Sequence, residues 1–224
     1  MSSAPITTVV VDYGGVLTNP LHETFAAFAA SVGIETAVLQ EAFARATVRH
    51  GRSPMADLET ARCTEAEMVA RVLAELPDGT GEDLLGGREF GDLWFRGRTV
   101  NAELVSFLRR LRAEGYRVAL LTNNVAEWGP RWRAQLPVDE LFDAVVDSSA
   151  EGVRKPDRLI YQRLLERLPA AAHECVFLDD LEENCAAASR IGMLAVPFTT
   201  TDEAIDQVVA LLRSRGAFNF RSVA

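Results

Sequence analysis

The stretch Ile6-Thr-Thr-Val-Val-Val-Asp12-Tyr-Gly-Gly15 decides the fold of this 224-residue chain. Its apolar, β-branched run predicts a strand buried on both faces, and the run ends on an aspartate followed by a glycine turn. A second apolar run, at residues 175–178, ends on the adjacent pair Asp179 and Asp180. Ligands collect at the carboxyl ends of parallel strands, so we expect the three carboxylates to converge on one small volume.

The composition narrows the class of protein. With 48% hydrophobic and 25% charged residues, the chain falls in the globular range. A net charge of -9 argues against binding to nucleic acid or to an anionic membrane, because both require a basic surface. The three cysteines lack the spacing of a disulfide framework or a zinc site, which fits a reducing cytoplasm. We find no signal peptide and no run of about 18 apolar residues, so we expect neither secretion nor membrane spanning.

Strand and helix patterns alternate regularly from about residue 101 onward. This alternation predicts an α/β fold with a Rossmann-like, doubly wound parallel sheet. Residues 21–94 instead carry alanine-rich segments with apolar residues at helical spacing, broken at residues 51–54. We therefore expect an inserted all-helical cap at residues 20–96 and a core formed by residues 1–19 and 97–224. The expected strands lie at residues 6–11, 117–121, 144–146, 175–178 and 194–196.

Four short motifs stand at the carboxyl ends of the expected strands. In order along the chain they are Val-Val-Val-Asp12-Tyr-Gly-Gly-Val-Leu, Leu-Leu-Thr122-Asn-Asn, Gly-Val-Arg-Lys155-Pro-Asp and Val-Phe-Leu-Asp179-Asp180-Leu-Glu-Glu-Asn184. This set resembles the haloacid dehalogenase-like hydrolase superfamily. One motif alone would be a weak signal, whereas four in order at strand ends are specific. The resemblance covers both ends of the core and implies that residues 21–94 form a mobile cap.

The resemblance implies a role for each motif residue, and the chemistry of the side chains agrees. Asp12 is the expected nucleophile, because a carboxylate there can attack phosphorus or carbon to form a covalent intermediate. Thr122 and Asn123 offer a hydroxyl and an amide to the oxygens of a phosphoryl group. Lys155 offsets the negative charge of the acids and of the transition state. We therefore expect Asp12, Lys155 and Thr122 to be catalytic, and Thr122, Asn123 and Lys155 to bind the substrate.

Magnesium is the expected cofactor. Carboxylates packed together require a divalent cation, a raised pKa or a nearby lysine, and Mg²⁺ prefers hard oxygen ligands. Asp12, the backbone carbonyl of Gly14 and Asp180 are the expected metal ligands. Asp179 is expected to support these ligands without binding the metal itself.

The sequence departs from the family pattern at Gly14. Most phosphatases of the superfamily carry a second aspartate there, which protonates the leaving oxygen, and general acid catalysis is commonly worth about 10²–10⁴-fold. A phosphatase could work without this aspartate if its substrate had a better leaving group or if the cap supplied a proton donor. His22 and Glu23 are the nearest candidates for that donor. The Asp-x-Gly-Gly-Val pattern resembles bacterial sugar-phosphate phosphatases and the amino-terminal phosphatase domains of epoxide hydrolases.

Two other hypotheses stay open. A 2-haloacid dehalogenase needs no proton for halide departure, but superfamily dehalogenases dispense with the metal, and Asp179 and Asp180 would then repel the nucleophile. A non-catalytic binding or regulatory domain would explain Gly14, but it has no need of Asp12 and Lys155.

We therefore expect a magnesium-dependent hydrolase that acts on a small phosphorylated metabolite through an aspartyl-phosphate intermediate. Exposed cap faces could support a homodimer. Trp94, Trp128 and Phe25 are interpreted as packing residues rather than as substrate platforms.

Overall fold

The computed structural model describes residues 4–80 and 84–215, which contain a five-stranded parallel sheet in the order β3-β2-β1-β4-β5. Strand β1 lies in the middle, with Val11 opposite Leu120 on one side and Leu178 on the other. The residue after β1 therefore stands between the ends of β2 and β4. The expected parallel, Rossmann-like sheet is confirmed, with strands β1 (Thr8–Val11), β2 (Arg117–Thr122), β3 (Ala144–Asp147), β4 (Cys175–Asp179) and β5 (Leu194–Pro197).

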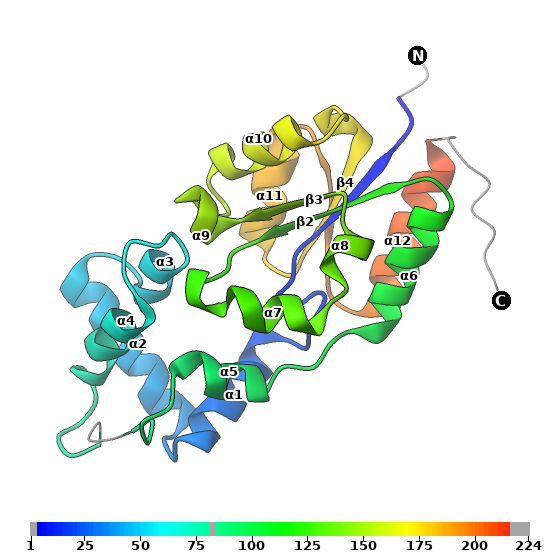
Figure 1. The fold of residues 1–224 in the computed structure, drawn as a ribbon. Helices are drawn as coiled ribbons and strands as arrows, with labels where there is room; N and C mark the ends of the chain where they lie inside the picture. The colour runs from blue at the N-terminus through cyan, green and yellow to red at the C-terminus, as the bar shows by residue number, and fades with distance from the viewer. Residues whose placement is uncertain (1–3, 81–83, 216–224) are drawn as a thin grey trace.

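Helices cover both faces of the sheet, as a parallel sheet requires. Successive strand side chains point to opposite faces, so Val9 and Val11 pack in one core and Val10 packs in the other. The first core includes α6 (Ala102–Ala113) and α12 (Thr201–Ser214), which lie side by side in Figure 1. The second core includes α10 (Arg158–Arg167) and α11 (Glu182–Arg190).

Among the residues that the structure describes, no helix is both long enough and apolar enough to cross a lipid bilayer.

Short helices complete the core. The helical segment at residues 126–135 is divided, because its first turn is a 3₁₀ helix. The short elements are η1 (Ala126–Trp128), α7 (Gly129–Gln135), α8 (Val138–Leu141), α9 (Ser148–Glu151) and η2 (Ala172–Glu174).

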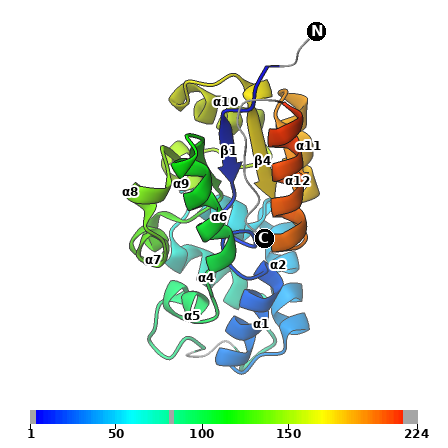
Figure 2. The same ribbon diagram turned by 90° about the vertical axis from the view of Figure 1, so that its right-hand side faces the viewer.

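The insertion after β1 is helical throughout its described part, and residues 81–83 of the expected cap fall outside the described residues. It builds an apolar cluster around Phe28, Met68 and Trp94, to which Val125 and Trp128 of the core also belong. Figure 2 shows the cap below the core, at the end toward which the arrows of β1 and β4 point. The cap therefore stands over the carboxyl edge of the sheet. Its helices are α1 (Leu21–Ser31), α2 (Thr36–His50), α3 (Pro54–Leu58), α4 (Glu65–Leu73) and α5 (Phe90–Arg96).

The expected break between two cap helices at residues 51–54 is confirmed at its first residue and wrong at its last. Gly51 ends α2 with a left-handed φ of 71°, which glycine adopts without steric cost. Pro54, however, is the first residue of α3. Proline is favourable in a first helical turn, since its missing N–H would have no partner there anyway.

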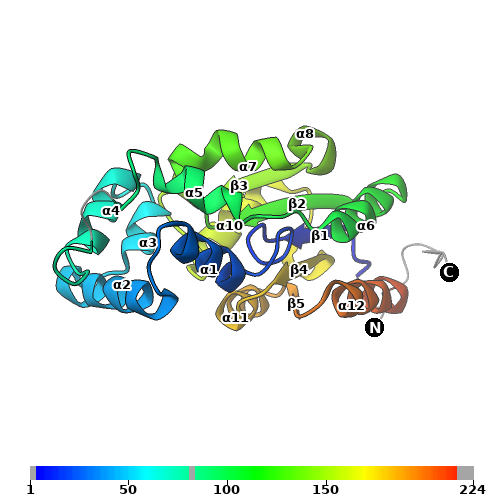
Figure 3. The same ribbon diagram turned by 90° about the horizontal axis from the view of Figure 1, so that it is seen from below.

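Two linkers join the cap to the core, and they lie side by side. Thr18 and Val100 form an isolated antiparallel bridge. The N–H of Asn19 donates to the carbonyl of Thr99 at 3.0 Å, and the N–H of Asn101 donates to Leu17 at 2.9 Å. Figure 3 shows α2, α3 and α4 at one end of the molecule and α6 and α12 at the other. The paired linkers hold residues 97–101 beside the turn that follows β1.

Candidate active site

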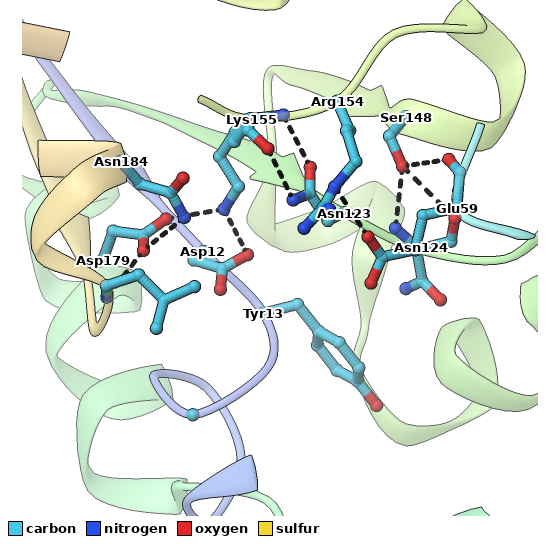
Figure 4. Close-up of polar contacts among 12 residues, drawn as sticks. Asp12, Tyr13, Glu59, Asn123, Asn124, Ser148, Arg154, Lys155, Asp179 and Asn184 are labelled. Carbon is cyan, nitrogen blue, oxygen red and sulfur yellow. Dashed lines mark hydrogen bonds and ion pairs between the residues drawn. The ribbon is translucent and has the colours of Figure 1, made fainter. Parts of the chain in front are cut away.

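A buried lysine joins two of the predicted acids. The Nζ of Lys155 lies 2.7 Å from Oδ1 of Asp12 and 2.6 Å from Oδ2 of Asp179 (Figure 4). Asp12 follows β1 and Asp179 ends β4, so the pairing of these strands brings both carboxylates to one edge. The Lys155 side chain is 1% exposed. The structure thus places the predicted nucleophile, lysine and supporting acid in direct contact.

Three carboxylates form the candidate metal centre. Oxygen atoms of Asp12, Asp179 and Asp180 lie within 4.8 Å of one another. Both oxygens of Asp179 are engaged, because Oδ2 contacts Lys155 and Oδ1 accepts from the N–H of Leu181 at 3.0 Å and from Asn184 Nδ2 at 2.8 Å. Oδ1 of Asp180, by contrast, is buried without a partner among the described residues. Oxygen donors with one unpartnered acceptor fit a magnesium ion, held by Asp12 and Asp180 rather than by Asp179.

The glycine turn after Asp12 makes room for Asp180. Gly15 has a φ of +83°, and a Cβ there would lie 2.3 Å from Oδ2 of Asp180. A side chain at this position would therefore displace the carboxylate. Gly14 lines the cavity beside it, and the role of the Gly14 carbonyl as a metal ligand stays a prediction.

The electrostatics of the cluster favour a bound cation. Burial raises the pKa of Asp12 to about 7, with Asp179 and Asp180 adding to the shift and Lys155 opposing it. Burial, followed by the charge of Asp179, also raises the pKa of Asp180. Burial disfavours the charged form of Lys155, but Asp12 and Asp179 outweigh that cost and raise its pKa. One lysine thus faces three acids, and a divalent cation would relieve the remaining repulsion.

Asn123 positions the lysine loop. Its Oδ1 accepts from the N–H of Lys155 at 2.8 Å, and its Nδ2 donates to the carbonyl of Lys155 at 3.1 Å. The amide therefore fixes the backbone of Lys155, while the contact of Asn123 with substrate stays a prediction. Thr122 ends β2 and is fully buried, and its Oγ1 has no hydrogen-bond partner among the described residues. Among the described residues, Asn123 lines the cavity above the acids, whereas Thr122 does not.

A cavity of about 330 Å³ opens above the acids. Its floor carries Asp12, Lys155 and Asp180, whereas its wall combines a group of apolar side chains with polar ones such as Gln40 and Glu59. Trp94 and Trp128, interpreted from the sequence as packing residues, serve both purposes: their rings are 6.0 Å apart in the cap cluster, and both line the cavity. The apolar lining residues are Leu21, Phe25, Met55, Trp94, Phe95, Trp128 and Leu181.

A cap-to-core contact that sequence reasoning missed closes one side of the cavity. Oε2 of Glu59, just after α3, lies 2.8 Å from Nε of Arg154, and the Ser148 hydroxyl donates to the Glu59 carbonyl at 2.6 Å. Burial raises the pKa of Glu59, although Arg154 opposes the shift. Of the two donors suggested from the sequence, His22 lines the cavity and Glu23 does not.

Arg98 is the second residue that sequence reasoning missed. Its guanidinium carbon lies 5.1 Å from the ring centre of Tyr13 and 5.7 Å from those of Trp94 and Phe95. Its Nη1 donates to Oγ1 of Thr18 at 3.3 Å. The available signal was topological: the second linker returns at the carboxyl edge of the sheet, so its residues must border the site.

A parallel sheet with a helical insertion after its first strand, and with an acidic cluster around a buried lysine at the carboxyl edge, defines a capped α/β hydrolase. The model of the haloacid dehalogenase-like hydrolase family matches residues 6–192. The chain belongs to this family, and the expectation of an enzyme of this class is confirmed.

Curated relatives and solved structures agree with that assignment. The sesquiterpene phosphatase astK of Aspergillus oryzae is 35% identical over 99 residues, which are 44% of this chain and 50% of that protein. Phosphatase MT3486 of Mycobacterium tuberculosis is 33% identical over 111 residues, or 49% and 51% of the two chains. The chain thus spans about half the length of these curated relatives.

A solved structure shares the fold. The HAD family enzyme bt-2542 of Bacteroides thetaiotaomicron, in complex with magnesium and inorganic phosphate, gives a TM-score of 0.62 at 19% identity. The match covers 88% of this chain and 96% of that chain.

Proposed function

We propose that this protein is a magnesium-dependent phosphatase that cleaves phosphate monoesters through a phosphorylated Asp12. The observation that carries the proposal is the Asp12 carboxylate, which is bound by Lys155 and faces a cavity beside the unpartnered oxygen of Asp180. The phosphatases astK and MT3486 among the curated relatives support the reaction class. The magnesium and phosphate in the bt-2542 complex support the choice of metal.

Asp12, Lys155 and Asp180 each have a role in the proposed reaction. An oxygen of Asp12 forms a bond to phosphorus while the bond from phosphorus to the alcohol oxygen breaks, and that oxygen keeps the electron pair. The alkoxide then takes a proton from water. A second water adds to phosphorus, the bond to Asp12 breaks, and inorganic phosphate leaves with the proton balance made by solvent. Lys155 holds Asp12 in place and offsets the charge on phosphorus, and a magnesium ion on Asp12 and Asp180 would supply electrostatic stabilisation.

The cavity wall suggests the kind of alcohol. The phosphoryl group requires the charged floor, so the organic part of the substrate extends into the rest of the cavity, where the apolar part of the wall includes Phe25, Trp94 and Trp128. Contact with such a wall favours an apolar organic group, because burial of apolar surface contributes roughly 25 cal/mol per Å². We therefore propose a small phosphate monoester with a largely apolar organic part. The sesquiterpene phosphatase among the relatives is consistent with this preference.

Hydrolysis of p-nitrophenyl phosphate with magnesium and with EDTA tests the proposal. Nitrophenolate leaves without protonation, so the assay is insensitive to the missing acid at Gly14. We expect metal-dependent phosphate release, and a panel of terpenyl, sugar and simple alkyl phosphates would then rank the substrates. Release of chloride from 2-chloropropionate without metal would support the dehalogenase hypothesis instead. Inactivity on every substrate would favour the binding domain.

We also propose that the protein works in the cytoplasm. Its cysteines, Cys63, Cys175 and Cys185, are buried and free, which fits a reducing compartment. Fractionation of cells that express the tagged protein, with a cytoplasmic marker as reference, checks this proposal. Recovery in an oxidising compartment would contradict it.

A further inference from the structure

Arg98 stands where the charged floor of the cavity meets its apolar wall. On the floor side, a Cβ built on Gly14 would lie 3.4 Å from both Nη1 and Nη2 of Arg98. On the wall side, the guanidinium packs against the rings of Trp94 and Phe95, which line the same cavity. Arg98 itself lines the cavity. The side chain thus occupies the space beside Gly14 into which a longer residue there would extend.

The positive charge of Arg98 is held in place but not neutralised. Aromatic faces attract a guanidinium without removing its charge. Among the described residues, Arg98 forms no ion pair. Its Nη1 donates to the hydroxyl of Thr18, its guanidinium also contacts Tyr13, and its Nε is buried without a partner. A cation with spare donors on a cavity wall is a ready receptor for an oxyanion.

The junction of floor and wall is also where the bridging oxygen of a substrate must lie. A phosphoryl group on Asp12 is attacked in line, so the leaving oxygen points away from the Asp12 carboxylate. The organic part attached to that oxygen contacts the apolar wall. The oxygen that joins the two parts therefore falls between Asp12 and Trp94, beside the guanidinium of Arg98.

We propose that Arg98 donates hydrogen bonds to the leaving oxygen and stabilises the negative charge that develops there, in place of a general acid at Gly14. This inference rests on the proposed phosphatase activity. As the bond from phosphorus to the leaving oxygen breaks, the electron pair stays on that oxygen, and the guanidinium offsets its charge. Arg98 keeps its own protons, and the alkoxide takes its proton from water.

Leaving-group dependence tests the proposal. We would measure kcat/KM of the wild-type protein and of Arg98→Met on p-nitrophenyl phosphate, phenyl phosphate and an alkyl phosphate. Methionine keeps an apolar stem against the rings but has no donor. We expect a loss of about 10²–10³-fold on the alkyl ester and less than about tenfold on the nitrophenyl ester. The ratio kcat/KM reports the phosphoryl-transfer step, so slow hydrolysis of the intermediate does not mask the effect.

Two further variants separate this role from a structural one. Arg96→Met changes an exposed arginine at the end of α5, two residues before Arg98, and should leave all three rates unchanged. Arg98→Lys keeps the charge and should recover part of the loss on the alkyl ester, which keeps the test valid if Arg98→Met fails to fold. An equal loss on every ester, or no loss, would overturn the proposal for Arg98 alone. Wild-type inactivity on p-nitrophenyl phosphate would overturn the phosphatase assignment itself, and this proposal with it.

Discussion

Lys155 and Asp12 form a buried ion pair of 2.7 Å, and Lys155 is the only lysine in a sequence that otherwise uses arginine for its permanently charged basic side chains. A lysine ammonium is a compact charge, whereas arginine presents a wide planar fork. Since Nζ also contacts Asp179 at 2.6 Å, the space between the two carboxylates fits an ammonium. The chain therefore uses lysine at the one position where the narrow gap between two acids demands it.

Replacement of Lys155 should be costly in both stability and activity. Lys155→Met would leave Asp12 and Asp179 buried without their positive partner, and breaking a buried pair typically costs about 3–5 kcal/mol. We expect urea denaturation to show a loss of that order and turnover to disappear. Lys155→Arg, the matched control, should restore charge but not geometry and should stay inactive. An active Lys155→Arg variant would contradict the argument from size.

Gly15→Ala should weaken magnesium binding. Alanine at a φ of +83° costs about 1–2 kcal/mol, and its Cβ would also lie 2.3 Å from Oδ2 of Asp180. Gly33→Ala is a matched control, because Gly33 has a φ of +71° with nothing within 4 Å of the added Cβ. We expect both variants to lose stability, and only Gly15→Ala to lose magnesium affinity in calorimetric titrations. Equal affinity in the two variants would contradict the role of Asp180.

Stability should fall in alkaline solution because of Cys175. Burial raises the pKa of its thiol to about 12, whereas an unfolded cysteine titrates near about 8.5. Between these values the folded state holds the proton and the unfolded state releases it, so the stabilisation present below about pH 8.5 is lost as the pH rises. Relative to Cys175→Ala, we expect the wild type to lose about 2 kcal/mol between pH 8 and pH 10. Parallel curves for the two proteins in pH-dependent denaturation would refute this prediction.

Gly14→Asp should fail to improve the wild-type protein. A Cβ at this position lies 3.4 Å from both Nη atoms of Arg98 and 3.2 Å from Leu21, so the new side chain fits after a small shift. The guanidinium would lower the pKa of the introduced carboxyl, which could not then act as an acid, and the carboxylate would neutralise Arg98. We expect kcat/KM on phenyl phosphate to fall in the wild-type background and to rise in the Arg98→Met background. A gain in the wild-type background would contradict the account.

The fold and the polar floor of the site followed from local sequence patterns. The apolar run before Asp12 and the run before Asp179 each indicated a buried strand, and adjacent parallel strands must deliver their next residues to one edge. The structure brings Asp12, Lys155, Asp179 and Asp180 together as the motifs predicted.

The wall of the cavity could not be predicted in this way. Glu59 reaches the site through the docking of the cap on the core, and Trp128 lines the cavity from the core side of that contact; no periodicity or spacing records the docking. Trp128 illustrates the difficulty: its ring packs against Phe90 with centres 5.9 Å apart, so its hydrophobic character is explained by packing even though it also lines the cavity. Similarly, Asn123 could not be assigned to the Lys155 backbone before the two loops were seen together.

We propose that Asp12 carries the phosphoryl group during the reaction. The most direct measurement is to mix the protein with magnesium and p-nitrophenyl phosphate, quench it in acid, reduce it with borohydride and map the product by peptide mass spectrometry. Borohydride converts an aspartyl phosphate to homoserine, so the account predicts homoserine at position 12 in the wild type and none in Asp12→Asn. Phosphate release with no reduced residue at position 12, or with the modification on another carboxylate, would contradict it.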